Sequence, residues 1–310
     1  MSAQTAFLFP GQGSQFVGMG QNLIERSPEI KAIFEQVDDI CKRPISRLCF
    51  EGPMSELTLT ENLQPAITAV NLACLAALHD AGMSATVSAG HSLGEYAALV
   101  SAGVLTYYDA LRLVQKRGEL MHREALANPG NMAAVIGIHI DAVEDIVSQA
   151  RGKDVLAVAN HNTAEQIVIT GQEEPISRAI RMVKARKGRA IPLKVSGAWH
   201  CKLMEGAVEE FRRFMDDIPF ARPESSVLFN ATAMIERDPE KIKDIMANQL
   251  VSPVRWYDIM VNMLDSGVSS FVEVGPNKVL IGLLKKILPA DKDVKTHNVQ
   301  DAKSLEGFLR

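Results

Sequence analysis

The feature that most restricts the fold is a serine between two glycines, Gly90-His91-Ser92-Leu93-Gly94, which fits the pattern G-x-S-x-G. A short apolar run, 86–90, precedes it, and a helix-forming segment, 93–102, follows it. A tight strand-to-helix turn leaves no room for Cβ atoms on either side of the serine, which explains the glycines. The turn would present Ser92 as a nucleophile above a sheet. The alternative is a structural glycine-rich turn in which the serine only caps a helix.

Strands and helices alternate along the rest of the chain, which predicts a mostly parallel sheet covered on both faces. In the middle of the chain the order of the expected strands and helices differs, and it predicts the βαββαβ order of a ferredoxin-like unit. Its expected segments are 132–138, 141–151, 155–160, 166–170, 173–187 and 189–193. We therefore expect an α/β fold with an α/β-hydrolase-like parallel-sheet body, residues 1–128 and 196–310, and an inserted ferredoxin-like small subdomain, residues 129–195.

Composition excludes several classes of protein. Hydrophobic residues make up 47% and charged residues 23% of the 310 residues, which excludes disordered and fibrous chains. The net charge of −4 argues against nucleic acid as a general partner. The four cysteines show no CxxC pair and no metal-like spacing, so we expect free thiols and no metal. No signal peptide or membrane span is evident. We expect a cytoplasmic, monomeric enzyme without a cofactor and without membrane contact.

A serine nucleophile needs a base, and His200 is the best candidate among the seven histidines. It lies in a loop where the small subdomain returns to the body, and such junction loops line clefts. The glycine-rich loop 10–15 follows the first strand, at the same sheet edge as the elbow, and can complete an oxyanion hole or cradle a phosphate. It lacks the Lys-Ser/Thr pair of a P-loop. Arg117 lies within the expected helix 109–125, where an arginine would ordinarily be solvated or ion-paired.

Charge is uneven along the chain. Between Pro175 and Met204 there are eight Lys and Arg residues and no Asp or Glu, so the remaining chain carries −12. The stretch is either a solvated helix face or a docking surface for an anionic partner.

Six motifs occur in register along the whole chain. They are Phe9-Pro-Gly-Gln-Gly-Ser-Gln15, Gly90-His-Ser-Leu-Gly-Glu-Tyr96, Arg117-Gly118, Gly197-Ala-Trp-His200, Gln249-Leu-Val-Ser-Pro-Val254 and Glu273-Val-Gly-Pro-Asn-Lys-Val279. With them the chain resembles the malonyl-CoA:acyl-carrier-protein transacylases of type II fatty acid synthesis. The resemblance implies that Ser92 takes the malonyl group from malonyl-CoA as an ester and passes it to holo acyl carrier protein. It implies that His200 is the general base, and that the backbone N–H groups of Gln12 and Leu93 form the oxyanion hole.

The resemblance also implies the substrate-binding residues. Arg117 would pair with the free carboxylate of malonate, and a backbone carbonyl near Gln249 would orient the imidazole without a third, acidic member. Asn160 is a further substrate-binding candidate. Trp199 stands where Phe or Ser is common, and its size should favour malonyl over methylmalonyl groups. Asn277 stands where Gly is usual; asparagine tolerates a positive φ, so the turn should persist.

The basic stretch gains a candidate partner from the resemblance, because acyl carrier proteins are acidic and coenzyme A carries phosphates. The docking candidates are Lys184, Arg186, Lys187 and Arg189. Three other functions compete with this interpretation: an acyl hydrolase that edits stalled chains on a polyketide synthase (PKS), a generic α/β-hydrolase esterase, and a binding module with a decayed site. The choice between fatty acid and polyketide synthesis stays open.

Overall fold

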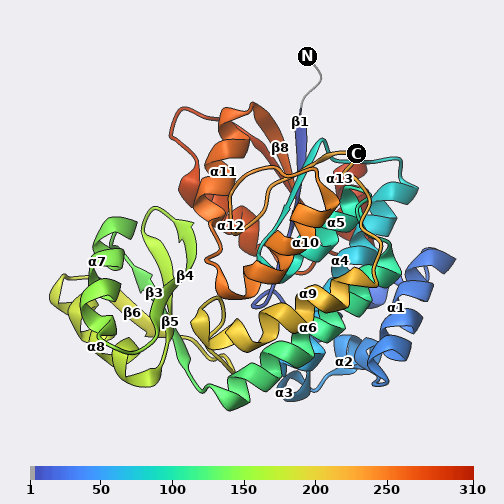
Figure 1. The fold of residues 1–310 in the computed structure, drawn as a ribbon. Helices are drawn as coiled ribbons and strands as arrows, with labels where there is room; N and C mark the ends of the chain where they lie inside the picture. Colours follow the sequence, from blue (N-terminus) through green and yellow to red (C-terminus); the bar gives the residue numbers. More distant parts are fainter. Residues whose placement is uncertain (1–3) are drawn as a thin grey trace.

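The larger sheet has five parallel strands in the order β7-β2-β1-β8-β9, seen at the centre of the computed structural model, which describes residues 4–310 (Figure 1). Every neighbouring pair is parallel. The strands are β1 (Gln4–Phe9), β2 (Val87–Gly90), β7 (Ser226–Val227), β8 (Val268–Val274) and β9 (Lys295–Val299). The predicted α/β class with a parallel-sheet body is confirmed, although β9 was not predicted.

Alternation along β1 divides the core of the body into two layers. Phe7 and Phe9 belong to a large hydrophobic cluster on one face of the sheet, whereas Ala6 and Leu8 belong to a second cluster on the other face. Successive side chains of a strand point to opposite faces, so a strand buried on both sides reads as a continuous apolar run. This burial explains why the inner part of β1, Ala6–Phe9, is apolar throughout.

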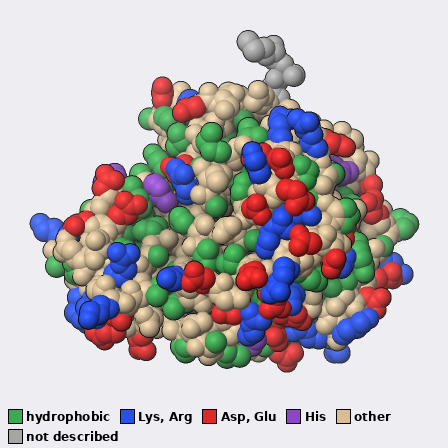
Figure 2. All heavy atoms as spheres, in the orientation of Figure 1, with side chains coloured by type: hydrophobic (Ala, Val, Ile, Leu, Met, Phe, Trp, Pro, Cys, Tyr) green, Lys and Arg blue, Asp and Glu red, His purple; other side chains and the backbone are tan. Residues whose placement is uncertain are grey.

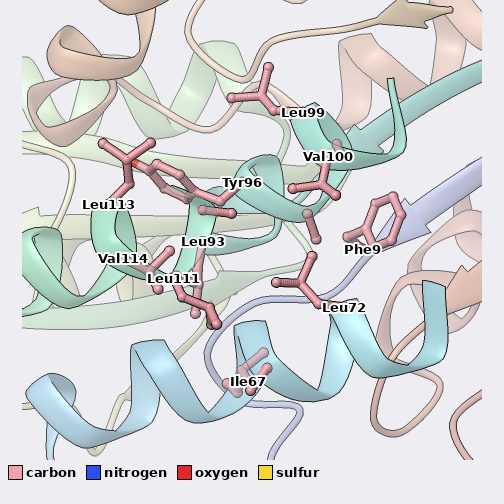
Figure 3. Packing of buried hydrophobic residues seen from close by; sticks show 14 of the residues in the cluster. Phe9, Ile67, Leu72, Leu93, Tyr96, Leu99, Val100, Leu111, Leu113 and Val114 are labelled. Atoms are coloured by element: carbon pink, nitrogen blue, oxygen red, sulfur yellow. The ribbon is translucent and has the colours of Figure 1, made fainter. Parts of the chain in front are cut away.

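Helices cover both faces of this sheet. The first cluster includes buried residues of α1 (Pro28–Cys41), α2 (Ile45–Glu51), α3 (Met54–Leu57), α4 (Thr60–Asp80), α5 (Glu95–Ser101), α6 (Tyr107–Ala127), α9 (Glu205–Asp216), α10 (Pro239–Asn248) and α13 (Ala302–Leu309). The second includes α11 (Trp256–Asp265) and α12 (Val279–Ile287). Short 3₁₀ turns are η1 (Gln21–Leu23), η2 (Ser92–Gly94), η3 (Lys202–Met204) and η4 (Gln249–Val251). Figure 3 shows Leu93 directed from the elbow into the space between α4 and α6.

The smaller sheet has four antiparallel strands in the order β4-β5-β3-β6. Its elements are β3 (Asn131–Ile136), α7 (Ile140–Arg151), β4 (Leu156–Thr163), β5 (Gln166–Gly171), α8 (Glu173–Ala185) and β6 (Arg189–Pro192). This order is the βαββαβ unit expected within residues 129–195, and it has a hydrophobic cluster of its own. Helices α7 and α8 lie on the side away from the body (Figure 1).

A backbone seam joins the small subdomain to the body. His161 N–H donates to the carbonyl of Val254 at 2.9 Å, and Val254 N–H donates to that of Ala159 at 2.8 Å. The His161 ring stacks on Tyr257 of α11 with 4.8 Å between centroids. The seam fixes β4 close to the end of η4, and so packs the small subdomain against α11 and α12 of the body. No helix within residues 4–310 has the length and apolar character to cross a membrane.

Candidate active site

The strand-to-helix turn at Ser92 is close-packed against the glycine-rich loop. A Cβ atom on Gly90 would lie 1.9 Å from the carbonyl carbon of Gly94, and one on Gly94 would lie 2.0 Å from the carbonyl oxygen of Phe9. A Cβ on Gly11 would lie 2.4 Å from the carbonyl oxygen of His91. Ser92 itself has a φ of 50°, a conformation that costs free energy in a non-glycine residue. The elbow predicted from G-x-S-x-G is present.

Ser92 and His200 form a hydrogen-bonded pair. Ser92 Oγ lies 2.7 Å from His200 Nε2. His200 Nδ1 lies 3.0 Å from the carbonyl oxygen of Gln249 and 3.1 Å from that of Ser252. Because carbonyl oxygens only accept, Nδ1 carries the proton and Nε2 is left to accept the hydroxyl proton of Ser92. The arrangement is a nucleophile with a base oriented by backbone, and no carboxylate contacts the imidazole within residues 4–310.

Three buried residues, Asn230, Gln249 and Glu95, form a hydrogen-bonded frame around the backbone of Ser92. Asn230 accepts from the backbone N–H of Ser92 through Oδ1 at 2.6 Å and donates to the Gly90 carbonyl through Nδ2 at 2.7 Å. Gln249 Nε2 donates to the Ser92 carbonyl at 2.9 Å and also to Glu95. Glu95 in turn accepts from Asn230 N–H at 2.6 Å. The frame holds the strained elbow from two distant parts of the chain. Burial raises the pKa of Glu95 to about 7.

Arg117 places a fully buried cation beside the nucleophile. Its guanidinium donates to Gln64 Oε1 at 2.7 Å, to Gln249 Oε1 at 2.9 Å and to Ser92 Oγ at 3.2 Å, and its Nε has no partner. Arg117 is 0% exposed, and no carboxylate among residues 4–310 lies within ion-pair distance of its guanidinium. An unpaired buried charge is costly, so the site is built for an anionic group that the chain does not supply.

Gln12 and Leu93, whose backbone N–H groups are the expected oxyanion hole, lie in two loops that pack against each other at the elbow. Leu93 is the second residue of η2. The first hydrogen bond of that turn runs from the Gly94 N–H to the His91 carbonyl at 3.0 Å, so the turn does not use the Leu93 N–H. Gln12 lies in the loop that packs its glycine on His91, and its side chain donates to Thr60 Oγ1 at 3.1 Å. This pairing of loops is what a two-donor oxyanion hole requires.

A family model described as an acyl transferase domain matches residues 6–304. The chain belongs to the acyl transferase family. The resemblance inferred from the motifs is thereby confirmed. The acyltransferase is 39% identical over 306 residues to a malonyl CoA-acyl carrier protein transacylase of Bacillus subtilis (strain 168), a match that covers 98% of this chain and 96% of the relative.

Solved structures agree with this assignment. An acyl carrier protein S-malonyltransferase from Vibrio cholerae is 37% identical with a TM-score of 0.93, and the match covers 99% of the acyltransferase and 100% of that chain. A malonyl-transacylase solved in complex with its type II PKS acyl-carrier protein is 34% identical with a TM-score of 0.94, covering 99% of both chains.

Two asparagines position the glycine-rich loop of the acyltransferase. Asn277 Nδ2 donates to the Ser14 carbonyl at 2.7 Å, and Asn71 Nδ2 donates to the Pro10 carbonyl at 2.9 Å. Asn277 has a φ of 65°, so the turn keeps the conformation expected there. The residue that replaces the usual glycine thus contributes a hydrogen bond that glycine lacks.

Changing Asn277→Gly should slow acylation of Ser92 about tenfold, because the variant keeps the turn but releases the loop that carries the Gln12 N–H. Single-turnover acylation by malonyl-CoA, followed by intact-protein mass, measures the rate. The melting temperature serves as the control. A lower melting temperature with an unchanged rate would mean that the contact supports only the fold.

The imidazole of His200 should stay neutral in mildly acidic solution. Burial, and next the positive charge of Arg117, lowers the pKa of His200 to about 3. Nitrogen-15 spectra of the labelled protein, assigned with His200→Asn, should therefore show one neutral Nδ1–H tautomer from pH 8 down to pH 5. A ring that titrates near its ordinary value of about 6.5 would contradict this assignment.

The remaining binding candidates lie at different distances from the reacting groups. Trp199 is 5% exposed, and a Cβ on Gly197 would meet its indole at 2.6 Å and Ala125 at 2.7 Å. Ala125 lies eight residues beyond Arg117 on α6, about 12 Å along the helix. The idea that Trp199 restricts methylmalonyl groups therefore stays a prediction. Asn160 is buried in β4 at the seam, where it bridges to Val254.

The four docking candidates are all exposed, but they are not equivalent. Arg186 pairs with Asp145 of α7 and donates to the Ala142 carbonyl at 3.1 Å. Lys184, Lys187 and Arg189 form no ion pair with any residue in the described range 4–310. Helix α8, which carries Lys184 in its last turn, lies on the outer side of the small subdomain (Figure 1). Basic and acidic side chains are interspersed over this lobe (Figure 2).

Sequence reasoning missed several polar residues around the site. Gln64, Glu95, Asn162 and Asn230 each make a side-chain contact with the catalytic region; Asn162 Oδ1, for example, lies 2.8 Å from His91 Nε2. Glu95 alone has a local signal, because it directly follows the elbow motif. The four cysteines are free, as expected, and all four are buried.

Proposed function

We propose that this acyltransferase moves the malonyl group of malonyl-CoA to the phosphopantetheine thiol of an acyl carrier protein through an ester on Ser92. The observation that carries the proposal is the unpaired, buried guanidinium of Arg117, 3.2 Å from the nucleophile. A guanidinium grips a carboxylate with two parallel hydrogen bonds, and malonyl is an acyl group that brings its own carboxylate.

The chemistry takes place in two balanced halves. Ser92 Oγ attacks the thioester carbonyl while His200 Nε2 takes its proton, and the N–H groups of Gln12 and Leu93 stabilise the oxyanion. The C–S bond breaks, and His200 returns the proton to the coenzyme A thiolate. The carrier thiol then attacks the ester by the same steps in reverse, with His200 as its base. Thioester exchange is nearly isoenergetic, so a reversible covalent relay suffices.

A cavity of about 670 Å³ beside Gln12 offers a route for the pantetheine arm. It is lined by the glycine-rich loop, by residues 58–63 near the start of α4, and by residues 193–196, which lead back from the small subdomain. Leu59, Leu193 and Val195 are 45%, 36% and 37% exposed there, and an apolar lining suits the neutral arm. Both substrates carry this arm, so one channel serves both half-reactions.

One labelling experiment tests the function. The protein is incubated with radiolabelled malonyl-CoA, and the adduct on Ser92 is isolated and mixed with holo carrier protein. We expect transfer of the label to the carrier. Rapid release as free malonate would instead identify a hydrolase, and the absence of any adduct would exclude covalent transfer.

We propose that the unpaired cations at Lys184, Lys187 and Arg189 help to attract an acidic carrier protein. The solved complex of a similar malonyl-transacylase with its carrier supports this class of partner. Replacing the three residues with glutamate should raise KM for the carrier about tenfold and flatten its salt dependence, with kcat unchanged. Lys31→Glu on α1, at the opposite end of the molecule, is the control (Figure 1). Unchanged kinetics with the carrier would mean that the three residues belong only to a solvated face.

A further inference from the structure

Ser92 Oγ contacts two groups at once. It lies 2.7 Å from His200 Nε2, to which it donates, and it accepts a hydrogen bond from Arg117 Nη2 at 3.2 Å. A charged donor draws electron density from the oxygen and occupies one of its two lone pairs. The contact with Arg117 therefore makes the hydroxyl a poorer nucleophile, even though the base is in place.

The same cation opposes the proton transfer that attack requires. When Ser92 gives its proton to His200, an imidazolium forms in a buried site that already holds an unneutralised guanidinium. Like charges at short range in such a site are strongly unfavourable. The charge of Arg117 is, after burial, the largest cause of the lowered pKa of His200.

The other groups around Arg117 do not cancel its charge. Gln64 of α4 and Gln249 of η4 offer neutral amide oxygens, and Tyr96 of α5 offers its ring, 5.9 Å from the guanidinium carbon. Glu95 of α5 is the nearby carboxyl, but Gln249 and Asn230 hold it, and burial raises its pKa to about 7. His91, beside the nucleophile, is hydrogen-bonded to Asn162, and burial lowers its pKa, which favours the neutral ring.

From this geometry we infer that Arg117 restrains the Ser92–His200 pair until a carboxylate binds to it. The bound carboxylate draws Nη2 away from Ser92 Oγ and neutralises the charge that opposes the imidazolium. The acyl group thus switches on the nucleophile that attacks it. Discrimination against acyl groups without a carboxylate then lies in the chemical step as well as in binding. The inference rests on the proposed function, because it takes Ser92 as the acylated residue.

A free carboxylate should release the restraint on Ser92 when the substrate itself has no carboxylate. Acetyl-CoA brings no carboxylate to Arg117, and formate is the smallest carboxylate that can supply one. We expect sodium formate to accelerate acetylation of Ser92 about 10- to 100-fold, saturably, relative to sodium chloride at equal ionic strength. Intact-protein mass spectrometry of samples quenched at successive times gives the rate of acetylation. Arg112→Ala, on the same helix but paired with Asp109, should keep the response, and Arg117→Ala should lose it.

A second probe needs no thioester. Phenylmethylsulfonyl fluoride is uncharged and modifies an active-site serine, so formate should also speed its reaction with Ser92 in the unmodified protein. Arg117→Ala should react at least as fast without formate as the parent does with it. The inference is overturned if formate leaves both rates unchanged or lowers them, or if Arg117→Ala reacts more slowly than the parent. Failure of malonyl-CoA to acylate Ser92 would overturn the proposed function instead, and the sulfonyl fluoride rates would still report on the restraint.

Discussion

Replacing Ser92 with alanine is expected to abolish the malonyl adduct and to lower transfer to the carrier by about ten-thousandfold or more. The hydroxyl is the atom that forms the ester, and water or a carrier thiol cannot reproduce its position 2.7 Å from His200 Nε2. The elbow should survive, because its backbone is held by Asn230 and Gln249 through the Ser92 N–H and carbonyl rather than through the side chain.

The matched control is Ser101→Ala. Ser101 lies at the end of α5, where its Oγ is 3.0 Å from Ser88 Oγ, so the variant loses a hydroxyl from the same strand–helix unit but not from the site. It should retain transfer and the adduct. Label that remains on the Ser92→Ala protein in stoichiometric amount would locate the nucleophile elsewhere and refute the assignment.

The second large effect is expected from Arg117→Ala. Without the guanidinium, the carboxylate of malonyl enters a buried site with only neutral partners, Gln64 and Gln249. Stranding one member of a buried ion pair costs roughly 3–5 kcal/mol, which corresponds to about two to four decades in the rate of malonyl acylation. An acetyl group no longer leaves a buried cation unpaired, so acetyl acylation should rise relative to malonyl acylation.

Acylation rates with malonyl-CoA and acetyl-CoA, measured side by side on both proteins, give the change in preference directly. Arg112→Ala again controls for the loss of an arginine from α6. An unchanged ratio of the two rates would remove Arg117 from substrate selection. A loss of both rates together would mean that the residue matters for the integrity of the site and not for the choice of acyl group.

Local patterns predicted much of the molecule. The elbow, the strand before it and the βαββαβ order each depend on neighbours in sequence, such as the glycines around Ser92 and the alternation of short apolar runs with helices. Strand β9 was missed because its segment, Lys295–Val299, mixes polar and apolar residues at an edge of the sheet. An edge strand buries less surface and so carries a weaker apolar signal.

The frame of the site could not be predicted in the same way. Asn230 reaches the elbow from 138 positions away, and Gln249 from 157, so only the folded chain defines these contacts. The folded surroundings also decide whether a charged side chain is buried and whether it is ion-paired. Arg117 looked like an ordinary helix arginine, yet it is fully buried without a carboxylate. Arg186, by contrast, looked free in sequence but pairs with Asp145.

The positive φ angles of the two reacting residues, 50° at Ser92 and 60° at His200, set the acyltransferase a trade-off between catalysis and heat resistance. Each residue occupies a conformation that glycine would adopt without strain. The sequence therefore keeps, at both positions, a side chain that strains the backbone in order to perform chemistry. Glycine at these positions would relax the backbone but remove the nucleophile and the base, so the local strain is inseparable from the chemistry.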